Sequence, residues 1–237
     1  MQHIDPASLA DLSTRVQYLR DFIGFTEKDA EALHAAAPVV APLVPVIVDT
    51  VYDKLFKFDV TAQSFVPRQT GYTGEAPVSL KDLNVEHPQI KFRKDFLSRY
   101  LVKLVTMDYE KFESWEYLDK VGIMHTGTTP GFLHRAKKPA LRVEYIHCAI
   151  LLGYVEDILV DAVLNHPDLD LATKTAVIRA ANKIIWIQND LFARHYVKDS
   201  AIALKTFTVD KLTANAGAII LIAIGAFASR FLSTWHR

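Results

Sequence analysis

The chain has 237 residues, half of them hydrophobic, which is enough for a substantial core in one large domain without disulfides or structural metals. Its 27 basic and 27 acidic residues give a formal net charge of zero, and this argues against the basic surface that general nucleic-acid binding requires. The single cysteine, Cys148, excludes an intramolecular disulfide, and the N-terminus lacks the basic-then-apolar order of a signal peptide. We therefore expect an intracellular protein that does not bind nucleic acid.

Apolar residues recur every three or four positions through most of the chain, a spacing that is typical of helices. Alternating strand patterns of useful length do not appear, so we predict an all-α protein of about eight helices. The expected helices lie at about 6–22, from 26 to the prolines at 38–45, and at 46–58, 88–105, 108–125, 139–165 and 170–197, with a last apolar helix in 212–232. The segments 67–86 and 126–139 carry glycines and prolines and are predicted to be loops.

Short-range signals mark several helix ends. Asp5 followed by Pro6 predicts a cap and a proline at the first helical position. Thr26 and Asp29 approximate a capping box. The prolines between 38 and 45 predict a kinked or broken passage between two helices. His87, directly before Pro88, is expected to be a loop or cap residue.

One histidine stands out at the end of the predicted helix 108–125. Leu118, Val121 and His125 are spaced so that they share one face, and most of that face is apolar. An imidazole at this place can offer a nitrogen ligand to a haem iron. The alternative is a core histidine that is hydrogen-bonded to a backbone carbonyl.

The surrounding sequence favours the haem interpretation. Five segments, in order, resemble those of the protoglobins and of the globin domains of globin-coupled sensors, and the match covers about residues 10–198. They are Thr26-Glu-Lys-Asp, Ile47-Val-Asp-Thr-Val-Tyr52-Asp-Lys-Leu, Phe92-Arg-Lys-Asp-Phe96, Val121-Gly-Ile-Met-His125 and Trp186-Ile-Gln-Asn-Asp-Leu-Phe. The resemblance implies a globin-like helical sandwich at 1–198, with an extra N-terminal helix before Gly24. It also implies haem b as cofactor, with His125 as the ligand to iron.

The same resemblance assigns a distal side to the haem. It places Tyr52 over the iron, where the phenol can donate a hydrogen bond to bound dioxygen, and Phe92 and Phe96 in the pocket wall. The alternatives are a buried tyrosine with a backbone partner and an aromatic stripe that only packs the core. Val51, next to Tyr52, is smaller than the aromatic residue that relatives can carry there, which indicates a roomier pocket.

The proximal side and the far wall of the pocket come from two helices. Tyr117 and Val121 precede His125 and are expected to border the porphyrin, although Tyr117 can equally be ordinary core. Ala149 and Ile150 are expected to wall the far side, where the family often has an aromatic residue. For His147 and Cys148, on the same helix as that wall, we favour a purely structural role.

The C-terminal tail carries a different signal. After a linker at 199–211, residues 212–229 contain no charged side chain, and eighteen residues is the lower edge of a membrane span. Residues 212–232 are therefore expected to form either a membrane anchor, with the globin domain in the cytosol, or an apolar helix that packs on the globin or on a second subunit of a homodimer.

These features predict a haem protein that reversibly binds dioxygen, carbon monoxide or nitric oxide, for sensing or storage rather than for catalysis. One alternative is a non-haem helical interaction module or membrane-attached adaptor. A further alternative is a redox haem enzyme such as a nitric oxide dioxygenase, which would need an electron source that this chain does not carry. The part after residue 198 shows no cyclase, kinase or methyl-accepting module.

Overall fold

The computed structural model describes residues 1–69, 71–128 and 142–197, and all the regular structure in these ranges is helical. Among the described residues there is no strand, which agrees with the all-α prediction. The α-helices are α1 (Leu12–Ile23), α2 (Glu27–Val40), α3 (Val44–Phe56), α4 (Asp59–Ala62), α5 (Pro88–Thr106), α6 (Phe112–Met124), α7 (Tyr145–Leu164) and α8 (Leu171–Ala193). Short 3-10 turns lie at Pro6–Ala10, Ala41–Leu43, Gln63–Phe65 and Leu80–Asp82.

The local signals in the sequence place most helix ends. Asp5 accepts a hydrogen bond from the Ala7 amide before the first turn, and Thr26 with Asp29 forms the predicted capping box. His87 is the N-cap of α5, where its ring accepts a hydrogen bond from the Gln89 amide. The proline-rich passage is a 3-10 turn between α2 and α3, because a proline ring removes a backbone donor that a continuous helix needs.

Four parts of the chain differ from the sequence expectation. The helix expected at 6–22 is a 3-10 turn at Pro6–Ala10 followed by α1, which starts at Leu12 with Asp11 as its N-cap. The segment 59–65 forms α4 and a 3-10 turn where no element was predicted. The helix expected from 108 starts only at Phe112, and the described part of the helix expected from 139 starts at Tyr145, where the N-cap Glu144 has extended backbone angles. The predicted linker and apolar helix at 199–232 lie outside the described residues.

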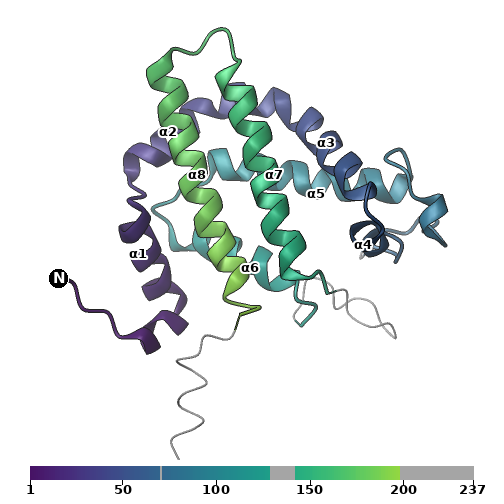
Figure 1. The fold of residues 1–237 in the computed structure, drawn as a ribbon, viewed down its shortest axis with the longest axis horizontal. Coiled ribbons are helices and arrows are strands. Elements are labelled where there is room, and N and C mark those ends of the chain that lie inside the picture. The colour runs from purple at the N-terminus through teal and green to yellow at the C-terminus, as the bar shows by residue number, and fades with distance from the viewer. Residues whose placement is uncertain (70, 129–141, 198–237) are drawn as a thin grey trace, which may run out of the picture. The chain divides into compact units, whose positions relative to one another are not determined.

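The core lies where α2, α3, α5, α6, α7 and α8 meet. Helices α7 and α8 run side by side, α8 also packs against α2 and α6, and α5 packs against α2 and α3 (Figure 1). The most deeply buried apolar side chains come from all six of these helices and include Leu33, Val51, Ile90, Leu118, Val163 and Ile184. Val51 is therefore fully enclosed in the core.

An aromatic cluster fixes the start of α6. The indole nitrogen of Trp115 donates a hydrogen bond to the Tyr109 carbonyl over 3.0 Å, and both side chains are buried. Phe25, which follows α1, contacts the Tyr109 and Trp115 rings edge-on at 5.1 and 5.9 Å between centroids. Because aromatic pairs of this kind add to the free energy of burial, the cluster holds the first turn of α6 against the N-terminal helices.

A part-buried ion pair ties α2 to α8. Lys183 Nζ lies 2.7 Å from Asp29 Oδ1 and 2.7 Å from the Gly24 carbonyl oxygen, and the Thr26 amide donates to Asp29 Oδ2 over 2.8 Å. Burial raises the pKa of Asp29, but the hydrogen bonds from Lys183 and Thr26 together outweigh this effect. The pKa is therefore lowered from 3.8.

This shift makes the stability of the fold depend on pH. A lowered pKa in the folded state stabilises the protein above the unfolded-state pKa, and this stabilisation is lost as the pH falls through the folded-state pKa. We expect Asp29→Asn to reduce the free energy of unfolding at pH 7 by about 1–3 kcal/mol, with a smaller difference in acid. Urea unfolding at both pH values measures this. Asp95→Asn, which breaks an exposed pair with Arg99, should change the free energy little.

One helical stretch of the described residues, Glu27–Phe56, has the length and composition that could cross a membrane. Core helices of globular proteins share this length and composition. The stretch supplies core residues such as Leu33, Val40 and Val48. It is also interrupted by the 3-10 turn at Ala41–Leu43.

Candidate functional site

His125 caps the C-terminal end of α6, and its ring is fixed by its own helix. Nδ1 lies 2.7 Å from the carbonyl oxygen of Val121, one turn earlier. Burial lowers the pKa of His125, against a smaller opposite effect of the hydrogen bond to Val121, so the ring is neutral at pH 7. Because a carbonyl oxygen can only accept, Nδ1 carries the proton and the lone pair of the neutral ring is on Nε2.

The last turn of α6 lies directly on α8. The His125 ring contacts Phe192 edge-on, with centroids 5.2 Å apart and an interplanar angle of 75°. Gly122 allows this approach, because a Cβ atom at that position would lie 2.4 Å from the Leu191 carbonyl oxygen. A glycine in the middle of a helix is therefore required here by packing rather than by backbone angles.

A buried glutamine joins helices α5, α6 and α8. Gln188 of α8 is 0% exposed, and its amide nitrogen donates to the Leu118 carbonyl oxygen of α6 over 3.1 Å. Its amide oxygen accepts from the Tyr100 hydroxyl of α5 over 3.1 Å. Because both ends of the buried amide are satisfied, it fixes the relative position of α5, α6 and α8.

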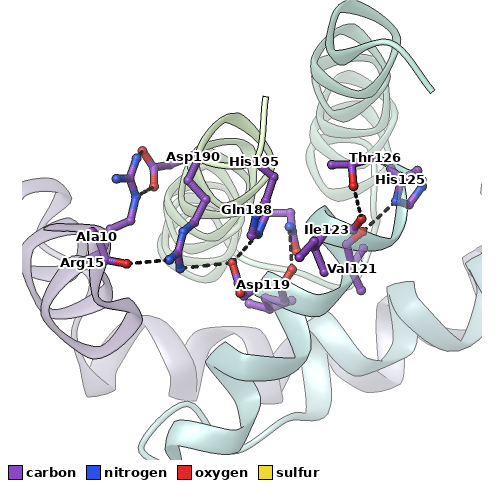
Figure 2. Close-up of polar contacts among 12 residues, drawn as sticks. Ala10, Arg15, Asp119, Val121, Ile123, His125, Thr126, Gln188, Asp190 and His195 are labelled. Atoms are coloured by element: carbon purple, nitrogen blue, oxygen red, sulfur yellow. Dashed lines mark hydrogen bonds and ion pairs between the residues drawn. The ribbon is translucent and has the colours of Figure 1, made fainter. Parts of the chain in front are cut away.

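A polar network joins α6 to the C-terminal end of α8 (Figure 2). Asp119 accepts from His195 Nε2 over 2.8 Å and from Arg194 over 3.2 Å. The same arginine donates to the Ala10 carbonyl oxygen, and Asp190 binds Arg15 of α1 through two hydrogen bonds of 2.6 and 2.8 Å. The C-terminal end of α8 therefore holds both α1 and α6, the helix that ends at the candidate haem ligand His125.

Helix α5 makes two kinds of contact with aromatic rings along its length. Near the C-terminal end of the helix, Lys103 lies 3.9 Å from the centroid of the Tyr117 ring of α6. Towards the N-terminal end, Phe92 and Phe96 contact each other edge-on at 5.2 Å, and Phe92 also contacts Tyr72 of the loop. Phe96 is 47% exposed.

Tyr52 belongs to a separate aromatic cluster. Its ring contacts Phe56 and Phe65, at 6.0 and 5.4 Å between centroids, and its side chain is buried. Burial raises the pKa of Tyr52, against a smaller lowering by Arg93, so the hydroxyl remains protonated and able to donate a hydrogen bond.

Two polar residues of α5 hold the segment next to this cluster. Gln89 is fully buried, donates to the carbonyl oxygens of Phe65 and Pro67, and accepts from the Gln69 amide, all within 3.1 Å. Arg93 donates to the Pro67 carbonyl oxygen over 3.1 Å and lies over the Phe65 ring at 5.0 Å. These contacts position Phe65, and through it the Tyr52 ring.

The two candidate wall residues on α7 differ in exposure. Ala149 is half-buried, whereas Ile150 is 68% exposed. Their roles in a pocket stay predictions. Cys148 is buried, and burial raises the pKa of its thiol to about 11, which makes it the inert apolar residue that the sequence indicated.

A match to a family model identifies the family of this chain. The protoglobin family model matches residues 12–201. The chain belongs to the protoglobin family. The matched range includes every helix from α1 to α8, so the α1 helix before Gly24 is part of the protoglobin fold in this chain.

Solved structures show the same fold. One of them is the globin domain of the Geobacter sulfurreducens globin-coupled sensor, at 18% sequence identity and a TM-score of 0.51. The alignment covers 77% of this chain and 97% of that domain. A search of curated proteins with this protoglobin sequence gave no significant match. The predicted globin-like, all-α fold is confirmed.

Several residues of the site were missed from sequence. Their signals were weak: a glycine inside an amphipathic helix, polar residues at buried helical positions, and a histidine near a helix end. The missed residues are Gln89, Arg93, Gly122, Gln188, Phe192, His195 and Tyr196.

Proposed function

We propose that this protoglobin binds haem b through His125 and reversibly binds a diatomic gas, dioxygen, carbon monoxide or nitric oxide, for sensing or storage in the cell. One observation carries the proposal. His125 is a neutral imidazole whose Nδ1 proton is held by the Val121 carbonyl, which leaves the lone pair on Nε2. A neutral imidazole with this tautomer is the form that binds a haem iron.

The surroundings of the site fit a flat apolar cofactor. Haem requires only one protein ligand to its iron. Among the described residues there is no cluster of three or more His, Cys, Asp or Glu side chains that could bind a metal ion without a cofactor. On α5, Lys103 contacts the Tyr117 ring of α6, and Phe96, two turns earlier on the same helix, is half-exposed. An exposed aromatic side chain of this kind gains free energy when an apolar ring covers it.

When bound, the haem would supply the iron that holds the gas, and the chain would supply the rest. His125 would hold and orient the cofactor. The buried side chains around Tyr52 would exclude water, and the Tyr52 hydroxyl would donate a hydrogen bond to the partly negative oxygen of the gas.

The optical spectrum of the purified ferrous protein, with and without carbon monoxide, tests this function. We expect an intense Soret band that shifts when carbon monoxide is added. A colourless protein that rejects added haemin would overturn the proposal and favour the non-haem interaction module.

We expect Tyr52→Phe to speed dioxygen dissociation by about tenfold, because one net hydrogen bond of about 1.4 kcal/mol is lost. Stopped-flow or flash photolysis measures the rate. Tyr154→Phe serves as the control, because it also removes a tyrosine hydroxyl. Tyr154 lies on another helix, α7, where its ring contacts Lys54. Equal rates in wild type and the Tyr52 variant would show that this hydroxyl does not reach the gas.

A further inference from the structure

We propose that His195 and Tyr196, in the turn that follows α8, are positioning residues that set the placement of His125 from two sides. The proposal rests on the haem-binding function proposed above. The turn is well defined, since the amides of residues 194–196 bond to the carbonyl oxygens of Asp190, Phe192 and Ala193.

The first attachment reaches α6 itself. His195 Nε2 donates to Asp119 over 2.8 Å, and the two side chains are only 14% and 19% exposed. Asp119 lies on the helix that ends at His125 and also accepts a hydrogen bond from Arg194; Figure 2 shows Asp119 beside His195. Because these charged hydrogen bonds are shielded from water, they resist sliding of α6 along α8.

The second attachment reaches the backbone of the ligand residue from the side of α7. The Val143 amide donates to the His125 carbonyl oxygen over 2.9 Å. The carbonyl oxygen of Val143 in turn accepts from the Tyr196 hydroxyl over 2.8 Å. Tyr196 is held in place by Tyr145, at 5.7 Å between ring centroids, and by Arg142, at 5.1 Å from the ring.

Together these attachments leave the His125 ring little freedom. Its orientation is fixed within α6 by Val121 and on α8 by Phe192, so the remaining freedom is displacement of the backbone. The bonds to Asp119 restrain displacement of the α6 backbone upstream of His125, and the bond from the Val143 amide restrains the backbone at His125 itself. A metal ligand that must hold its geometry closely depends on supports of this kind.

The test compares two tyrosines whose hydroxyl groups bond to different partners: Tyr196 to Val143 and to the Cys148 thiol, and Tyr145 to Asn189. Tyr196→Phe removes the hydrogen bond to Val143, and Tyr145→Phe removes one of similar length, 3.1 Å, from Tyr145 to Asn189. In the haem-loaded protein we expect only Tyr196→Phe to shift or broaden the iron–histidine stretching band. It should also speed haem loss to apomyoglobin by about tenfold, the rate equivalent of one hydrogen bond.

A second measurement does not require haem. In the apoprotein, hydrogen exchange of the Val143 amide should be about tenfold faster in Tyr196→Phe and unchanged in Tyr145→Phe. His195→Leu should speed exchange of the His125 and Thr126 amides at the end of α6. His195→Gln should restore slow exchange, because a glutamine amide can also donate to Asp119.

The outcomes separate the two proposals. A wild-type protein that binds no haem would refute the proposed function, while the exchange of Val143 and Thr126 would still decide whether His195 and Tyr196 place His125. If Tyr196→Phe and Tyr145→Phe behave alike in every measurement, or if Gln at position 195 does not rescue, the positioning role is overturned.

Discussion

Replacing His125 by alanine is expected to abolish haem retention or weaken it strongly while the helices remain folded. The loss should exceed the roughly 10- to 100-fold effect that is typical when only a hydrogen-bond partner of a metal ligand is removed. The change removes the Nε2 lone pair and the hydrogen bond between Nδ1 and the Val121 carbonyl. Haem content after gel filtration and the rate of haem transfer to apomyoglobin measure the loss, and circular dichroism reports the helices.

His147→Ala is the matched control, since His147 is a partly buried histidine on α7. It should retain haem with the wild-type spectrum. Full haem retention with an unchanged spectrum in His125→Ala would mean that another side chain binds the iron.

Gly122→Ala is expected to destabilise the fold by about 1–3 kcal/mol, although alanine is the better helix former. The added Cβ would meet the Leu191 carbonyl oxygen at 2.4 Å and its carbon at 3.1 Å. These are backbone atoms, which cannot rotate away, so α6 and α8 must separate. Because the His125 ring contacts Phe192 across the same interface, haem affinity should fall together with stability.

Gly153→Ala on α7 isolates the packing effect. A Cβ at that position meets nothing within 4 Å, so this change should stabilise the protein by up to about 1 kcal/mol through helix propensity alone. Urea unfolding of both variants gives the two free energies. A stabilised Gly122→Ala protein would contradict the close contact between α6 and α8.

Features that depend on short stretches of sequence could be predicted. The spacing of apolar residues indicated the helices, and the capping box at Thr26 and Asp29 placed the start of α2. Proline chemistry predicted the break before α3. The position of His125 at the end of α6 follows from local spacing in the same way.

The starts of α6 and α7 could not be predicted from the sequence. Helix α6 starts at Phe112, and the buried contact between Tyr109 and Trp115 joins residues on either side of that start. Val143 bonds to His125 across a long stretch of chain, and α7 begins after it. Tertiary contacts therefore override the local preference for helix at these positions.

By itself, the sequence determined that this protein is helical, roughly where most of its helices lie, and that a histidine closes the helix before the second loop. Only the tertiary structure decided that Gln188 joins Leu118 to Tyr100, that Asp119 binds His195, and that Tyr196 reaches the residue bonded to His125. The physical reason is that helix formation depends on residues within a turn or two of each other. The partner of a buried polar group, in contrast, is chosen by how separate helices pack.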